Sequence, residues 1–185
     1  MDIKNRKIVG QVLVIFLAFY LDGLMKWAFL NNMNHGTVAI LPQLMLMMIV
    51  MLTMRIDNRR QLITYGVVFG LIYDSYYYGI IGLYTILLPL LMVGIDHFKF
   101  LLVKNNLGYE LSIYFLSLTF LQSGIYLLER LLQQTNTSVF DFITYTLGPT
   151  LLWNIVVFFI LYIPLNNLSE WLVKYRRDNK WEISF

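Results

Sequence analysis

The positions of the basic side chains constrain this chain more than any other feature of its sequence. Six apolar stretches divide the chain, and lysine and arginine fall almost entirely at alternate gaps beside these stretches. These gaps contain Lys4, Arg6, Lys7, Arg55, Arg59, Arg60, Lys99, Lys104, Lys174, Arg176, Arg177 and Lys180. The remaining gaps contain only Lys26 and Arg130. Because short basic loops stay on the cytoplasmic side of a membrane, the pattern predicts an integral membrane protein with both termini in the cytoplasm.

The composition agrees with a membrane protein made of one domain. Hydrophobic residues make up 58% of the 185 residues and charged residues only 14%. Six helices with short loops use nearly all of the chain, so we expect a single membrane domain over residues 1–185 with no separate soluble module. The net charge of +3 comes from the cytoplasmic loops. It therefore does not indicate a nucleic-acid partner.

Six membrane-spanning helices can be placed on the apolar stretches, since about 20 helical residues cross a hydrocarbon core of about 30 Å. The predicted spans are residues 8–30, 37–54, 62–77, 80–103, 111–132 and 142–165. We place Pro42 in the first turn of the second span and expect Pro89 to kink the fourth. Tyr76, Tyr77 and Tyr78 cluster where the third span reaches the outer interface, and tyrosine is expected to form an aromatic belt there.

A basic amphipathic segment follows the last span, over residues 168–185. Its apolar side chains recur at helical spacing, which predicts a short helix lying on the inner leaflet of the bilayer. The candidate lipid contacts are Trp171, Lys174, Arg176 and Arg177. The alternative is a docking surface for a cytoplasmic protein.

The sequence offers no catalytic, cofactor-binding or metal-binding constellation. The chain has no cysteine and only two histidines, His35 and His97, neither of which has a second metal ligand at helical spacing. Paired acids or a Ser/His dyad within the spans are not visible either. We therefore expect a protein that is not an enzyme and needs no cofactor.

Charged residues inside the spans are costly and must be explained one at a time. Asp22 and Lys26 are four residues apart, so they lie on one helix face and are expected to form a local ion pair near the outer interface. Glu129 and Arg130 lie close enough to the outer end of the fifth span to remain solvated. A transport relay would need further acids or histidines, which the spans do not supply.

The third span carries glycine at a spacing typical of packed membrane helices. Gly66, Gly70 and Asp74 follow one another every four residues and so share a helix face. Small residues at this spacing let another backbone approach closely. Two interpretations remain open: this face packs in a hairpin between the third and fourth spans, or it forms a groove that binds a partner.

Directly after this face, the sequence predicts a hairpin turn bounded by glycine. Asp74 and Ser75 precede Gly79 and Gly82, and their carboxylate and hydroxyl can accept hydrogen bonds from exposed amides of the next helix. The candidate turn residues are therefore Asp74, Ser75, Gly79 and Gly82.

The string from Gly70 to Pro89 resembles a known family. Gly70-x3-Asp74, the aromatic turn, Gly79-x2-Gly82 and then Pro89 within an apolar helix resemble the rod shape-determining protein MreD in its Gram-positive form. The resemblance implies a six-helix fold similar to the substrate-binding subunits of energy-coupling-factor vitamin transporters.

The same resemblance implies a scaffold of cell-wall elongation that supports peptidoglycan synthesis and cell shape. The implied partners are the single-span coiled-coil protein MreC, a class B penicillin-binding protein, the RodA glycosyltransferase and, in rods, the MreB filament. The alternative is a substrate-binding subunit of a vitamin importer. Such subunits carry an alanine-x3-alanine pattern in the first helix, whereas here Ala18 and Ala28 are ten residues apart.

Overall fold

The computed structural model describes residues 3–33, 38–99 and 107–173, and these residues form helices and connecting turns without any strand. Six helical rods can be followed through the described residues, because α3 continues into η1, and α6 and η2 continue into α7. In chain order the elements are α1 (Ile3–Met33), α2 (Leu44–Arg55), α3 (Arg59–Tyr73), η1 (Asp74–Tyr78), α4 (Leu83–Phe98), α5 (Leu107–Leu131), α6 (Val139–Asp141), η2 (Phe142–Leu147) and α7 (Gly148–Val173).

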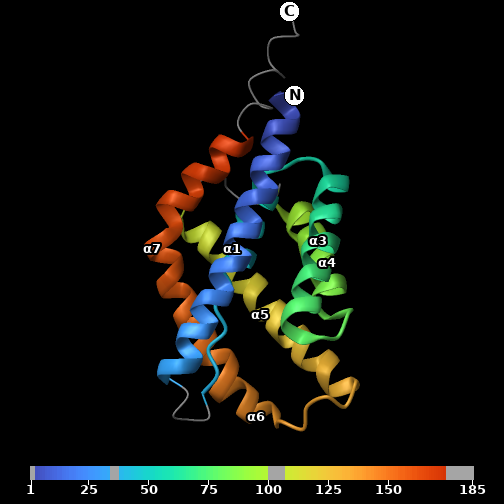
Figure 1. Cartoon of the computed structure of the whole chain (residues 1–185), viewed down its shortest axis with the longest axis vertical. Coiled ribbons are helices and arrows are strands. Elements are labelled where there is room, and N and C mark those ends of the chain that lie inside the picture. The colour runs from blue at the N-terminus through green and yellow to red at the C-terminus, as the bar shows by residue number, and fades with distance from the viewer. Residues whose placement is uncertain (1–2, 34–37, 100–106, 174–185) are drawn as a thin grey trace, which may run out of the picture.

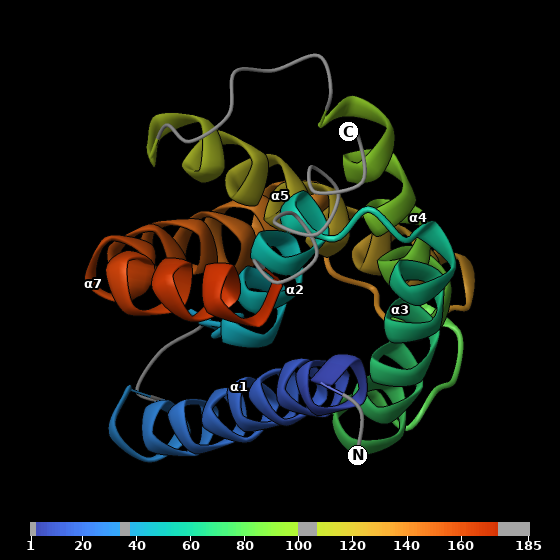
Figure 2. The ribbon, with the colours of Figure 1, turned by 90° about the horizontal axis from the view of Figure 1, so that it is seen from above.

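Helix α2 is the centre of the bundle. Seen along its axis, it lies inside a ring formed by the other long helices, and it contacts α1, α4, α5 and α7 (Figure 2). Every side chain from Leu44 to Thr53 is buried. A helix that is apolar on all sides is stable only where other apolar groups cover all of it, and this sequence of leucine, methionine and isoleucine fits that position.

Because α2 has only 12 residues, it is about 18 Å long, which is shorter than a hydrocarbon core of about 30 Å. At its C-terminal end, the Arg55 guanidinium donates to the carbonyl of Met51 at 2.7 Å and pairs with Glu110 of α5, also at 2.7 Å. The Lys99 ammonium, at the end of α4, donates to the carbonyl of Ile56 at 2.7 Å. Two cations therefore lie at the negative end of the helix dipole, and Lys99 binds the carbonyl of the residue that directly follows the helix.

The outer surface of the bundle is apolar, as expected for helices that face lipid. Side chains such as Leu13 and Phe16 of α1 and Leu152 and Ile160 of α7 are exposed. Three helical stretches are long and apolar enough to cross a membrane: Asn5–Ala28, Leu107–Leu131 and Val139–Val173. Helices α2 and α4 are apolar but shorter.

Two of the predicted spans differ clearly from the structure. The second was predicted over residues 37–54, but residues 38–43 are not helical and Pro42 precedes α2 instead of lying in its first turn. The reason is that this segment hydrogen-bonds elsewhere: the amide of Ala39 donates to the carbonyl of Tyr145 at 2.8 Å. The sixth was predicted over residues 142–165, whereas its helical rod runs from Val139 to Val173.

The separate interfacial helix predicted over residues 168–185 is also wrong for the part that the structure describes. Residues 168–173 continue α7, and Leu172 is buried against Gly10 of α1 because Gly10 has no side chain. Trp171 is exposed. The other three candidate lipid contacts, Lys174, Arg176 and Arg177, lie outside the described residues.

The first and last described helices meet at one end of the bundle (Figure 1). The Lys7 ammonium donates to the carbonyl of Trp171 at 3.0 Å, and the Gln11 amide donates to the carbonyl of Leu172 at 3.2 Å. Gln61, near the start of α3, donates to Gln11 at 2.8 Å. The beginning of α1, the beginning of α3 and the end of α7 therefore share this end, which also carries the charges around Arg55.

The glycine face of α3 lies against α4. A Cβ atom added to Gly70 would lie 2.7 Å from the Cα of Thr85, and one added to Gly66 would lie 2.8 Å from the Cα of Pro89. Backbone atoms of α4 therefore occupy the space that a side chain would need. The interpretation of Gly66, Gly70 and Asp74 as a face for another protein is thus wrong, because α4 of the same chain already covers it.

We predict that Gly70→Ala destabilises the bundle, because the new methyl group must push apart two backbones. The expected loss is about 1–3 kcal/mol of unfolding free energy. Equilibrium unfolding in mixed detergent micelles measures it. Gly94→Ala in α4 is the matched control, since a Cβ atom there meets nothing within 4 Å. Its stability should be unchanged or higher; equal effects of the two substitutions would contradict the close contact of α3 and α4.

Candidate functional site

A second group of buried polar side chains lies at the end of the bundle opposite to the start of α1 and the end of α7, where Asp74 closes the turn between α3 and α4. Its carboxylate is fully buried and accepts hydrogen bonds from the amides of Gly82, Tyr84 and Thr85 at 2.9, 2.7 and 3.0 Å. The hydroxyl of Thr85 also donates to it, at 2.8 Å. One carboxylate thus satisfies the first free amides of α4, which in a dry environment have no water to bond.

The remaining predicted turn residues have different roles. Gly79 and Gly82 have φ values of 68° and 125°, which side chains strongly disfavour, so the turn needs glycine at both positions. Ser75 does not accept from the next helix as predicted. Its hydroxyl donates to the carbonyl of Leu71 at 2.8 Å, within its own helix.

Asp22 caps the N-terminal end of α2 in the same way that Asp74 caps α4. Its carboxylate, only 2% exposed, accepts from the amides of Leu44 and Met45 at 2.6 and 2.9 Å. The predicted local ion pair with Lys26 is therefore wrong: no such pair occurs among the described residues, and the Lys26 ammonium lies 4.9 Å from the ring centre of Tyr77. An anion at the N-terminal end of a buried helix is also favoured by the helix dipole.

Gln43, directly before α2, joins four further buried polar groups that the sequence did not single out. Its amide N–H donates to the Asn154 side chain of α7 at 2.9 Å, and its carbonyl accepts from the Tyr114 hydroxyl at 3.2 Å. Its side chain donates to the hydroxyls of Tyr84 at 2.8 Å and Tyr73 at 3.4 Å. These bonds link α3, α4, α5 and α7 at the N-terminal end of α2.

The aromatic residues after α3 are partly internal, in contrast to the predicted interfacial belt. Tyr76 is exposed, as such a belt requires. Tyr77 packs on Phe19 of α1, with ring centres 5.3 Å apart, and Tyr78 faces a cavity. The end of η1 therefore contributes side chains to the interior as well as to the surface.

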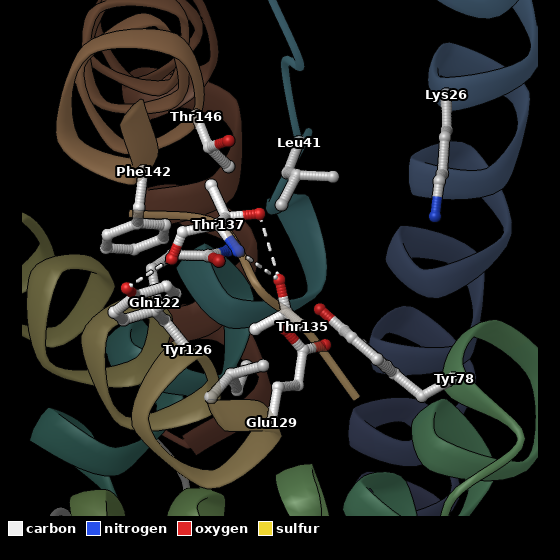
Figure 3. A pocket seen from close by; sticks show the side chains of 11 residues that line it. Lys26, Leu41, Tyr78, Gln122, Tyr126, Glu129, Thr135, Thr137, Phe142 and Thr146 are labelled. Carbon is white, nitrogen blue, oxygen red and sulfur yellow. Dashed lines mark hydrogen bonds between the residues drawn. The ribbon is translucent and has the colours of Figure 1, made fainter. Parts of the chain in front are cut away.

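This cavity has a volume of about 230 Å³ and lies between α1, α5, η1 and η2 (Figure 3). Its wall combines charged, hydroxyl, amide and aromatic side chains. The lining residues are Lys26, Leu41, Tyr78, Gln122, Ile125, Tyr126, Glu129, Thr135, Thr137, Phe142 and Thr146. Groups of three or more His, Cys, Asp or Glu side chains that could hold a metal ion do not occur in the described part of the chain.

Ring stacking and hydrogen bonds hold one wall of the cavity in place. The rings of Tyr126 and Phe142 stack with centres 4.2 Å apart, and the Tyr126 hydroxyl donates to the carbonyl of Thr137 at 2.9 Å. Arg130, which is exposed as predicted, donates to the same hydroxyl at 2.9 Å. The loop between α5 and α6 is thereby held over the end of α5.

We predict that Asp22→Ala lowers the unfolding free energy by about 3 kcal/mol, because two buried amides lose a charged acceptor. Lys26→Met removes the other member of the pair expected from the sequence, and its effect should be much smaller. Equilibrium unfolding of both variants in the same mixed micelles distinguishes the capping role from an ion pair. Equal losses in the two variants would show that Asp22 acts through Lys26.

Comparison with known proteins identifies the family of this chain. A family model for the rod shape-determining protein MreD matches residues 6–171. The cell shape-determining protein MreD of Streptococcus pneumoniae (strain ATCC BAA-255 / R6) is 33% identical over 92 residues, which are 50% of this chain and 56% of that relative. The chain thus matches little more than half the length of that relative. No solved structure matches the chain. Because the family model extends from the first turns of α1 to the last turn of α7, the chain belongs to the MreD family of rod shape-determining proteins.

Proposed function

We propose that this chain is a non-enzymatic scaffold of the cell-wall elongation machinery, which binds an MreC-type single-span protein within the membrane. Membership in the MreD family implies a role in determining cell shape. The observation that carries the proposal is the extent of the family match, which includes every helix that packs around α2. A class B penicillin-binding protein, a RodA-type glycosyltransferase and MreB are the further proposed members of the complex.

We place the chain in the bacterial plasma membrane as one six-helix domain with both termini in the cytoplasm. The meeting of α1 and α7 at one end supports this placement, because that end also carries Arg55, Arg59 and Arg60 on either side of the α2–α3 connection. Trp171, 66% exposed beside Lys7, is suited to the inner interface. Lys174, Arg176 and Arg177 are proposed to contact the same leaflet.

The partner helix is proposed to contact the outward side of α1. The glycine face of α3 is covered by α4, so it is not available. Along α1, exposed apolar side chains recur at helical spacing and form one continuous stripe. The stripe consists of Leu13, Phe16, Leu17, Tyr20 and Leu24.

The similarity of the fold to the substrate-binding subunits of vitamin transporters stays a prediction.

We predict that the protein, purified from native membranes in mild detergent, brings with it a single-span coiled-coil protein and a penicillin-binding protein. Mass spectrometry of the co-eluting proteins identifies them. An ATPase pair with a large membrane coupling subunit would contradict the scaffold and favour a vitamin receptor.

A photo-crosslinking residue tests the α1 contact separately from the scaffold. Placed at Leu17, it should crosslink to the coiled-coil partner in living cells. At Leu152 of α7, which is at least as exposed, it should not. Crosslinks from position 152 alone would move the contact to α7 and leave the scaffold proposal intact.

A further inference from the structure

We propose that the cavity between α1, α5, η1 and η2 is a binding site for a small zwitterion, a molecule with one ammonium and one anionic group. A free amino acid and an ethanolamine lipid headgroup both have this chemistry. The proposal is independent of the scaffold function and rests on three features of the cavity: an unpartnered buried donor, two opposite charges and its size.

The buried donor is the side-chain amide of Gln122. Gln122 is 3% exposed and lines the cavity, and its Nε2 atom has no hydrogen-bond partner. A buried amide without a partner is unfavourable, so its presence calls for an explanation. A carboxylate or phosphate oxygen in the cavity would accept the hydrogen bond that the protein itself does not supply.

The two charges are Lys26 and Glu129, which line the same cavity and are both partly buried. Figure 3 shows Lys26 of α1 on one side of the cavity and Gln122 and Glu129 of α5 on the other. Neither forms an ion pair within 4.0 Å among the described residues. A zwitterion matches this arrangement, because its anionic group can bind Lys26 and Gln122 while its ammonium group binds Glu129. A ligand of either single charge would leave one of the two uncompensated.

The size and walls of the cavity limit the ligand further. Its volume of about 230 Å³ is below the roughly 300–1,000 Å³ of sites for drug-sized ligands, so one amino acid or one headgroup is the appropriate scale. Leu41 and the Phe142 ring supply an apolar wall for a short carbon chain. The two π-helical turns, η1 and η2, both contribute lining residues, and such turns occur frequently at functional sites.

The test uses the full chain purified in detergent, with the twenty common amino acids and the D-forms of the nineteen chiral ones at millimolar concentration as probes. An amino acid present at about 100 times its Kd should raise the midpoint of thermal unfolding by about 5 °C or more. The lipid arm compares nanodiscs of phosphatidylethanolamine with nanodiscs of phosphatidylcholine. Only the ethanolamine ammonium can donate hydrogen bonds to Glu129, so stabilisation by the first lipid alone identifies a headgroup as the ligand.

Gln122→Leu separates binding from folding. It removes an unpartnered buried donor, so the empty protein should be as stable as the wild type or more stable, while the affinity for the zwitterion falls about tenfold or more. Gln134→Leu is the control, because Gln134 is exposed and does not line the cavity.

A second variant, Lys26→Met, should weaken binding of the zwitterion but not of the corresponding amine without its carboxylate. Absence of stabilisation by every probe, or unchanged binding in Gln122→Leu, would overturn the proposal.

Discussion

The hydrogen bonds at the two ends of α2 are the interactions on which the rest of this fold depends. A helix of 12 residues cannot reach both surfaces of a bilayer, so its free amides and carbonyls must find partners inside the protein. Asp22 supplies the acceptor at one end, and Arg55 and Lys99 supply donors at the other. With its ends satisfied, α2 can bury every side chain from Leu44 to Thr53, and the surrounding helices gain one common core.

The same solution occurs at α4, and the repetition explains how the helices are paired. In each case a carboxylate of the preceding helical segment caps the N-terminal end of the next helix along the chain: Asp22 of α1 caps α2, and Asp74, at the end of α3, caps α4. Because the cap must lie beside the amides it binds, it fixes the point on its own helix at which the next helix begins. At the α3–α4 pair, Gly66 and Gly70 then allow direct backbone contact along the whole hairpin.

The sequence predicted the α3–α4 pair better than the α1–α2 pair. The α3–α4 hairpin is local: Asp74 lies 8–11 residues before its partners, and the glycine spacing marks the contact face. Asp22 lies 22 and 23 residues before its partners, with Lys26 closer along its own helix, so local spacing suggested the wrong partner. One signal was available: α2 begins at Leu44 after Pro42 and Gln43, with no serine or aspartate to cap it, so a cap from elsewhere was required. The local sequence did not indicate the roles of Gln43, Asn154 and Gln122, because these roles depend on tertiary contacts.

The capping of α2 also explains why charge remains uncompensated at the same end of the molecule. One helical turn separates Asp22 from Lys26, and a free carboxylate there would neutralise the ammonium. The amides of Leu44 and Met45 occupy that carboxylate instead, so Lys26 is left beside the Tyr77 ring and the cavity. The need to satisfy a buried helix end therefore produces a cation that faces Glu129 and Gln122 across a small cavity. The hydrogen bonds that stabilise α2 thus leave a cation and an anion on opposite sides of the cavity, as the proposed zwitterion site requires.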